Sequence, residues 1–159
     1  MKIDLKWEKP LQLKDGSATN RIYTCSELRR IATKPGVYVF ARRFSGGVFP
    51  LYVGQAKNLR SRIDHQFKSN VPLMVGLQHA PNGRRILLVG RVSLHRGQQK
   101  AKVLDIVESA LIKHALAQGH DLLNQQGTKT KVHAIKSKGN HTSRQVAPLK
   151  MLVERRRGN

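Results

Sequence analysis

The chain has 159 residues, a length that suits one compact domain with an arm or tail. Thirty Lys and Arg against nine Asp and Glu give a formal net charge of +21, which indicates a polyanionic partner such as nucleic acid. The single cysteine, Cys25, excludes an internal disulfide framework, and no apolar run approaches the about 18 residues of a membrane span, so we expect a soluble, cytoplasmic protein with no membrane contact.

The first third of the sequence predicts an irregular approach followed by a β-hairpin. Residues 1–25 are polar and lack a clear period, and SELRRIA at 26–32 predicts a short helix capped by Ser26. GVYVFARR at 36–43 and VFPLYVG at 48–54 are rich in β-branched and aromatic residues, as strands are. Because SGG separates the two segments, we expect them to pair as an antiparallel hairpin.

Beyond the hairpin the hydrophobic pattern becomes helical. Leu59, Ile63 and Phe67 recur every four residues, which places them on one face of a helix. RILLVGRVSL at 85–94 is a short apolar run after a PNG turn signal and predicts a buried strand. The longest helix is expected over 98–118. These elements predict an α/β (α+β) fold in which helices flank a three-stranded antiparallel sheet.

Glu108 has an unusual position in the predicted long helix. The apolar stripe of that helix is formed by Leu104, Val107, Leu111 and Ala115, and Gly119 is placed to end the helix. At about 100° per residue Glu108 falls about 40° from Leu104, inside the stripe. A desolvated carboxylate is costly unless it is paired or binds a cation. Glu108 is therefore either a buried acid paired with a core Arg or Lys, or a metal ligand.

The helix after the hairpin carries two arginines with different expected roles. Arg62 lies at the edge of the buried face, beside His65 and Gln66, and is placed to clamp a phosphate through two hydrogen bonds. Arg60 points roughly the other way, near Asp64, as a surface pair would. We expect Arg60 to be solvated or to contact backbone.

Two tyrosines lie on the neighbouring strands of the hairpin. Tyr38 and Tyr52 approach each other if the strand register puts them on one face of the sheet. Either tyrosine alone is more often a half-buried packing residue. Beside Arg62 and Glu108, the pair indicates a functional site.

The motifs, taken in order, resemble those of the GIY-YIG nuclease superfamily. The matching features are GVY at 36–38, YVG at 52–54, Arg62, Glu108 in a later helix, and Asn124 in LLNQQG. The phrase LYVGQAKNLRSRI is similar to the start of the first helix in the N-terminal cleavage domain of the bacterial nucleotide-excision-repair endonuclease. This order of motifs is far more specific than a lone GVY or YVG.

The resemblance implies a metal-dependent DNA endonuclease with a single divalent ion, Mg²⁺ or Mn²⁺. Tyr38 would be the general base, assisted by Tyr52, and Arg62 would hold the scissile phosphate. Glu108 would be the sole protein carboxylate on the metal, because Mg²⁺ binds through one or two carboxylates and keeps several waters. The supporting residues would be Asn124, Gly54 and His65.

Two positions depart from the family pattern. Gln55 stands where the repair nucleases usually carry lysine, and Gln66 stands where relatives often have histidine or tyrosine. His65 is a candidate substitute as proton carrier, although a surface histidine is the simpler interpretation.

The resemblance divides the chain into three segments. Residues 1–34 form an N-terminal extension, 35–127 the GIY-YIG-like nuclease domain, and 128–159 a basic C-terminal tail. The tail is either solvated or disordered, or an arm that tracks DNA. The residues expected to bind nucleic acid are Lys57, Arg60, Lys129, Lys131, Lys136 and Lys138.

Two functional alternatives stay open at this stage. The chain is either an endonuclease acting on duplex or single-stranded DNA, as a monomer or homodimer, or a catalytically inactive nucleic-acid-binding module that keeps the fold. Within the first, a sequence-specific restriction-type enzyme would need base-reading side chains and a dimer, whereas a structure- or damage-directed enzyme would not. The sequence does not exclude RNA as a substrate.

Overall fold

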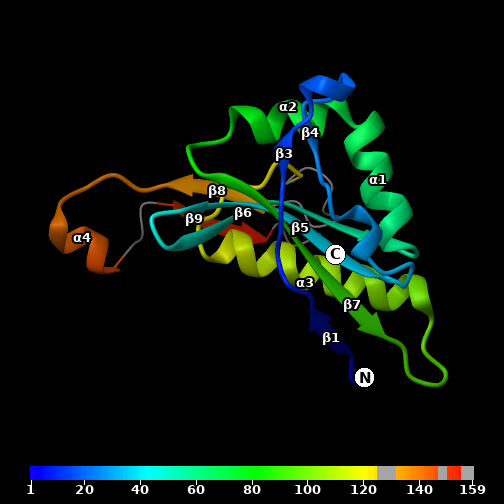
Figure 1. Cartoon of the computed structure of the whole chain (residues 1–159). Coiled ribbons are helices and arrows are strands. Elements are labelled where there is room, and N and C mark those ends of the chain that lie inside the picture. Colours follow the sequence, from blue (N-terminus) through cyan, green and yellow to red (C-terminus); the bar gives the residue numbers. More distant parts are fainter. Residues whose placement is uncertain (125–131, 147–149, 155–159) are drawn as a thin grey trace.

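The computed structural model describes residues 1–124, 132–146 and 150–154. An antiparallel sheet lies at its centre, with the strand order β1-β7-β5-β6, and β2 pairs with β7 as well (Figure 1). Helices cover both faces of this sheet, so the predicted α+β class is confirmed. The sheet strands are β1 (Asp4–Trp7), β2 (Leu11–Gln12), β5 (Gly36–Phe44), β6 (Gly47–Ala56) and β7 (Arg84–Ser93).

The predicted hairpin is formed by β5 and β6. Its two-residue turn consists of Ser45 and Gly46, with φ of 48° and 78°, the positive values that tight hairpin turns need. Tyr38 pairs with Gly54 across the strands, and the register shifts between Phe40 and Ala41. The predicted strand at 85–94 is β7, which pairs with β5 on the other side.

The N-terminal prediction was wrong in two respects. Residues 1–25 are not irregular throughout, because β1 and β2 pair with β7 and enlarge the three-stranded sheet to five strands. Strands of four and two residues are too short to show a period in the sequence. The helix expected at 26–32 is a 3₁₀ turn, η2 (Leu28–Arg30), whose first cap is Glu27 rather than Ser26.

Four further elements complete the N-terminal part. Strands β3 (Lys14–Asp15) and β4 (Tyr23–Thr24) form a separate two-stranded sheet, with the 3₁₀ turn η1 (Ser17–Thr19) between them. The 3₁₀ turn η2 follows β4 and leads into β5. These short elements lie over one edge of the helical layer formed by α1 and α2 (Figure 1).

The helix after β6 forms as predicted. Helix α1 (Leu59–Ser69) buries Leu59, Ile63 and Phe67 and begins at Asn58, whose side-chain oxygen accepts a hydrogen bond from the Ser61 N–H at 3.1 Å. Buried Gln66 lies on the same face as these apolar side chains.

The next helix, α2 (Val71–His79), was not predicted from the sequence. Asn70 caps it and a proline lies in its first turn, two signals typical of a helix start. The predicted long helix is α3 (Lys100–Ala117), and it ends at Gly119, whose φ is +83°, as expected.

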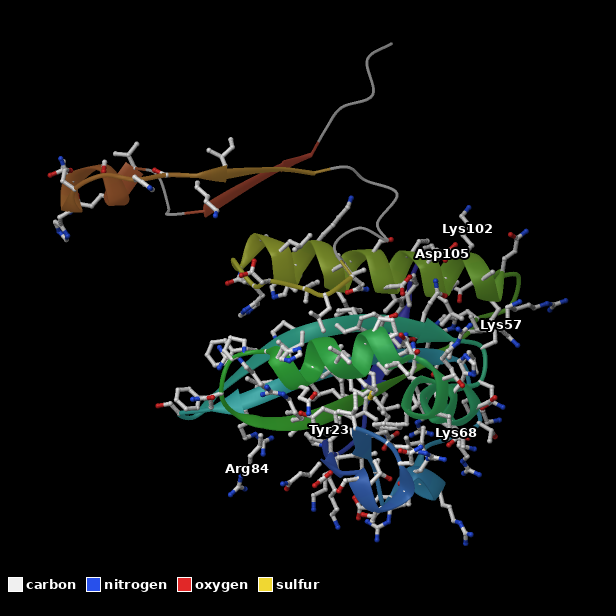
Figure 2. All side chains as sticks on the ribbon, turned by 90° about the horizontal axis from the view of Figure 1, so that it is seen from above. Tyr23, Lys57, Lys68, Arg84, Lys102 and Asp105 are labelled. Atoms are coloured by element: carbon white, nitrogen blue, oxygen red, sulfur yellow. The ribbon has the colours of Figure 1, made fainter. Side chains whose placement is uncertain are left out.

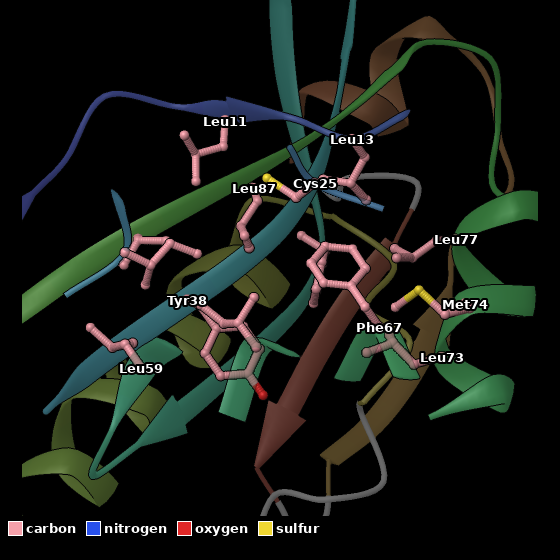
Figure 3. Close-up of a cluster of buried hydrophobic side chains, with 14 of the residues drawn as sticks. Leu11, Leu13, Cys25, Tyr38, Leu59, Phe67, Leu73, Met74, Leu77 and Leu87 are labelled. Atoms are coloured by element: carbon pink, nitrogen blue, oxygen red, sulfur yellow. The ribbon is translucent and has the colours of Figure 1, made fainter. Parts of the chain in front are cut away.

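Two cores lie on opposite faces of the sheet. Helices α1 and α2 cover the first core, which contains Tyr38, Phe40 and Leu87 (Figure 3). Helix α3 covers the second, an aliphatic layer that includes Val39 and Val53. In the described ranges, none of the helices is long and apolar enough to cross a membrane.

The described part of the basic tail is folded rather than wholly disordered. Strands β8 (Val132–Lys136) and β9 (Lys150–Glu154) pair antiparallel in a sheet of their own, and α4 (His141–Val146) lies between them in sequence. Lys136 and Lys138 are exposed there, whereas Lys129 and Lys131 lie outside the described residues. The division of the chain at residues 34 and 127 stays a prediction.

Candidate active site

The predicted site residues lie on both sides of the edge strand β6. Tyr38 and Tyr52 belong to the face covered by α1 and α2, which we call the tyrosine face. Gln55 lies on the opposite face and contacts Asp105 and Glu108 of α3, which we call the glutamate face. The two groups approach each other where β6 ends and α1 begins.

Gly54 allows Tyr38 to take its position. The two residues are directly opposite each other, and the Tyr38 ring lies over the Gly54 backbone. A Cβ atom on Gly54 would lie 2.5 Å from the phenol oxygen, closer than real Cβ atoms approach. The glycine of the second motif is therefore required by the tyrosine of the first.

Tyr38 is almost fully buried, with 1% of its surface exposed. Its ring lies 6.2 Å from that of Tyr52, at 27° between the planes, so the predicted approach of the two tyrosines is confirmed. Burial raises the pKa of Tyr38 above its usual value. A hydrogen bond from Gln66 and the nearby charge of Arg62 lower this pKa, but by less than burial raises it. The phenol is protonated at neutral pH unless a cation or donor lowers this pKa further.

Glu108 is half-buried rather than enclosed in the core. The Gln55 side-chain nitrogen donates to an oxygen of Glu108 at 3.0 Å and to one of Asp105 at 2.6 Å. Burial raises the pKa of Glu108, and Asp105 raises it further, whereas Gln55 and Arg62 lower it. In the described part of the chain no Lys or Arg lies within 4 Å of Glu108, so the core ion pair considered for it is absent.

Arg62 connects the two faces electrostatically. Its charge lowers the pKa of both Tyr38 and Glu108. Its side chain is exposed and borders a cleft of about 650 Å³. The cleft is lined by Gln55, Ala56, Lys57, Asn58, Ser61, Arg62 and His65. Two predicted nucleic-acid or supporting residues, Lys57 and His65, thus face the same opening as Arg62.

Asn124 holds the edge of β6 next to the motif glycine. Its side-chain oxygen accepts from the Val53 N–H at 3.3 Å and its nitrogen donates to the Val53 carbonyl at 2.5 Å. The adjacent Leu123 N–H donates to the Leu51 carbonyl at 2.7 Å. Asn124 therefore contacts the backbone of β6 beside Gly54, and its supporting role stays a prediction.

Arg60 is bound to backbone, one of the two expectations for it. Its guanidinium donates to the carbonyls of Ile31 and Arg29 at 2.8 and 2.7 Å. The expected pair with Asp64 is not formed, because Asp64 pairs with Lys68 one turn later. Contact of Arg60 with nucleic acid stays a prediction.

The oxygen ligands near the cleft suit a hard divalent cation. Glu108 and Asp105 direct oxygens to one amide nitrogen, so the two carboxylates are close enough to share a ligand. A cluster of three or more His, Cys, Asp or Glu side chains that could hold a metal is absent from the described residues. An ion at this place would therefore have few protein ligands, as the resemblance implied.

Two residues with contacts at the site, Asp105 and Asn70, were not among the sequence candidates. Asp105 precedes Glu108 by one helical turn, a spacing that puts the two side chains on one side of the helix and was visible in the sequence. Figure 2 shows Asp105 on α3 at the same end of the molecule as Lys57 and Lys102, with Arg84 at the other end. Asn70 contacts Gln66 four residues earlier, a spacing that brings two helical side chains together and was also visible in the sequence.

Comparison with known proteins gives one short similarity. Over 43 residues, 27% of this chain, the sequence is 49% identical to the UvrABC system protein C of Deinococcus radiodurans. The chain covers only 6% of that protein's length. No protein-family model matches the chain, and no solved structure matches it. The chain therefore contains a segment similar to UvrABC system protein C, in agreement with the resemblance drawn from the motifs.

Proposed function

We propose that this chain is a GIY-YIG-type nuclease that hydrolyses phosphodiester bonds in DNA. The observation that carries the proposal is the arrangement of Tyr38 and Glu108 on opposite faces of β6, with Arg62 close enough to lower the pKa of both. The short similarity to UvrABC system protein C supports the same activity. The net charge of +21 supports nucleic acid as the substrate.

Arg62 would bind the scissile phosphate in the cleft. Its guanidinium is exposed and borders the opening beside Lys57, so a phosphate can approach both cations. A planar guanidinium binds two phosphate oxygens at once and stabilises the charge that develops during attack. The same charge favours loss of the Tyr38 proton, so binding of the phosphate and action of the base depend on one residue.

Tyr38 would take the proton from the attacking water. Because burial raises its pKa, the phenol cannot do this without help from its surroundings. Gln66 donates a hydrogen bond to the phenol oxygen at 2.6 Å, and Arg62 adds positive charge. Tyr52 stacks against the ring and holds its plane.

Glu108 would hold the divalent ion, with Asp105 beside it. A bound Mg²⁺ or Mn²⁺ would supply positive charge to the phosphate oxygens that gain charge in the reaction. Gln55 keeps both carboxylates turned toward one point through its two hydrogen bonds. A carboxylate whose pKa is raised by burial and by a neighbouring acid gains most from such a cation.

A binding module without activity fits these residues less well. Glu108 contacts Gln55, which lines the cleft, and a carboxylate so close to the opening repels phosphate, so a protein that only binds DNA gains nothing from it. The half-buried position of Glu108 also carries a desolvation cost that binding does not repay.

Cleavage of defined substrates tests the proposal. Supercoiled plasmid, linear duplex, single-stranded DNA and RNA are incubated with Mg²⁺, Mn²⁺ or chelator, with Tyr38→Phe and Glu108→Ala beside the parent. We expect metal-dependent cutting of DNA that both substitutions abolish while DNA affinity is kept. Tight, salt-sensitive binding without cutting of any substrate would support the binding module instead.

A further inference from the structure

A line of polar side chains runs through the core beneath the tyrosine face. Gln66 is the one buried polar side chain among the described residues, with 5% of its surface exposed. It contacts Tyr38 on one side and Asn70 on the other, at 2.6 and 2.8 Å. Asn70 in turn caps α2 by accepting from the Leu73 N–H at 3.2 Å. Every member of the line has a partner.

The direction of each hydrogen bond in this line follows from its first member. A backbone N–H can only donate, so the Asn70 oxygen must face Leu73 and its NH₂ group must face Gln66. The Gln66 oxygen then accepts from Asn70, which leaves the Gln66 NH₂ group facing the phenol oxygen of Tyr38. The helix cap thereby decides which end of a buried amide meets the tyrosine.

We propose that Gln66, oriented by Asn70, is a positioning residue that fixes the phenol oxygen of Tyr38 as a hydrogen-bond acceptor. This inference rests on the proposed role of Tyr38 as the base. An oxygen that accepts from Gln66 has its own proton free to point elsewhere, and the oxygen keeps a donor after the proton has left. The arrangement favours the deprotonated phenol at the moment of attack.

The surroundings explain why a donor is needed at this place. The groups that face the phenol with a charge or a titratable proton are Tyr52 from β6 and Arg62 from α1. Burial and Tyr52 favour the neutral phenol, whereas Arg62 and Gln66 favour the ionised form. Figure 3 shows Tyr38 between the apolar side chains of Leu59 and Phe67, which offer its oxygen no hydrogen bond. Gln66 is the donor within this layer.

Packing alone does not account for Gln66. Its neighbours on the buried face of α1, Ile63 and Phe67, are apolar, and a leucine would fill a similar volume. Burying an amide is costly unless both of its ends are satisfied. Here the two ends are satisfied by Asn70 and by Tyr38, so the amide donates to Tyr38 while its oxygen also keeps a hydrogen bond.

Two substitutions remove the donor in different ways. Asn70→Asp keeps the cap of α2, because a carboxylate still accepts from the Leu73 N–H, but it cannot donate to Gln66. The Gln66 amide then turns and presents its oxygen to Tyr38. Gln66→Leu removes the amide without adding a charge. Asn140→Asp is the matched control, since Asn140 caps α4 through the Ser143 N–H in the same way.

The first measurement follows the Gln66 NH₂ group by NMR in the protein without DNA. We expect one of its two protons to have an unusual chemical shift and to exchange slowly with water. Tyr38→Phe and Asn70→Asp should both abolish these two properties, whereas Asn140→Asp should keep them. An amide that ignores Tyr38→Phe would overturn the proposal. This readout needs no activity, so it separates the positioning of Tyr38 from the proposed nuclease function.

The second measurement is the pH dependence of kcat for DNA cleavage. In Asn70→Asp and Gln66→Leu we expect kcat to fall by about tenfold or more and its rise with pH to move up by about one unit, with KM unchanged and the fold kept at lower stability. Unchanged profiles in both variants would show that the amide serves packing only. The protein could cut no substrate while its Gln66 amide responds to the substitutions as expected. That result would overturn the nuclease function, but it would support the assigned direction of the hydrogen bond from Gln66 to Tyr38.

Discussion

The two faces of the central sheet hold their parts of the candidate site in different ways. On the tyrosine face, Tyr38 is enclosed in the core and its oxygen accepts a buried hydrogen bond from Gln66, which in turn contacts the half-buried Asn70. On the glutamate face, the core under α3 is aliphatic, and the polar contacts of Glu108 and Asp105 lie at its rim. Packing fixes the position of Tyr38, whereas Glu108 and Asp105 stay accessible to solvent.

This difference would suit two tasks of the proposed hydrolytic site, control of the base on one face and binding of the cation on the other. A base whose proton affinity must be controlled benefits from a rigid, dry environment, because each neighbouring dipole acts strongly there. A ligand for an exchangeable cation benefits from an opening to water. Substitutions on the tyrosine face should therefore affect stability together with chemistry, whereas those on the glutamate face should affect chemistry alone.

The largest expected effect comes from the residue that acts on both faces. Arg62→Ala should lower kcat by about a thousandfold, in the range seen when a residue that stabilises charge in the transition state is removed. Arg84→Ala is the control, because it removes the same charge from an exposed site at the other end of the molecule (Figure 2). Similar losses of kcat in both variants would mean that net charge, not the position of Arg62, supports cleavage.

The second effect tests the close contact on the tyrosine face. Gly54→Ala should reduce activity by about a hundredfold and stability by about 1–3 kcal/mol, because the new Cβ displaces the Tyr38 ring. Thermal unfolding and cleavage rates measure the two losses. Gly76→Ala is the control, since its Cβ would meet only the flexible end of Leu123 and should leave both values near those of the parent.

The third effect concerns stability at alkaline pH. The pKa of Tyr38 is raised in the folded protein, so above about pH 10 the unfolded chain releases this proton first and folding loses about 1.4 kcal/mol per pH unit. The loss ends once the pH passes the folded-state pKa. Urea unfolding from pH 8 to pH 11 should show a shallower decline for Tyr38→Phe. Equal slopes would contradict the enclosed environment assigned to Tyr38.

The smallest effect distinguishes the two acids of the glutamate face. Asp105→Asn should weaken the affinity for Mg²⁺ or Mn²⁺ by about three- to tenfold and slow cleavage to match, while stability is kept. Metal titrations of the cleavage rate measure this change. Asp64→Asn, on α1 and paired with Lys68, should alter neither quantity; if it does, loss of any surface acid would account for the result.

The sequence predicted the elements whose patterns are long and missed those whose patterns are short. The nine-residue β5, the ten-residue β6 and β7, the stripe of α1 and part of the stripe of α3 were expected. Strands β1 and β2 were not predicted, because they pair with β7, which lies far along the chain. Helix α2 was not predicted, although the capping residue Asn70 and the proline in its first turn are typical of a helix start.

The sequence named Tyr38, Tyr52, Arg62 and Glu108 as candidates, but it predicted neither Asp105 and Asn70 nor the hydrogen bonds of the site. Gln55 and Gln66 appeared in the sequence only as departures from a motif. Their partners lie 53 and 28 residues away, at Glu108 and Tyr38, so no local pattern contains these contacts. Glu108 is half-buried rather than central, because the buried stripe of α3 also includes Val103, Ile112 and Leu116.

The hydrogen bonds between Asn124 and Val53 join residues that are 71 positions apart. This separation bears on the order in which parts of the protein fold during synthesis. A chain grows from its N-terminus, and domains fold as their residues emerge. The sheet, α1 and the basic surface can therefore form before the edge of β6 is fastened. Chains truncated before Asn124 should bind DNA without cutting it, so the proposed nuclease activity would begin only after residue 124 has been added.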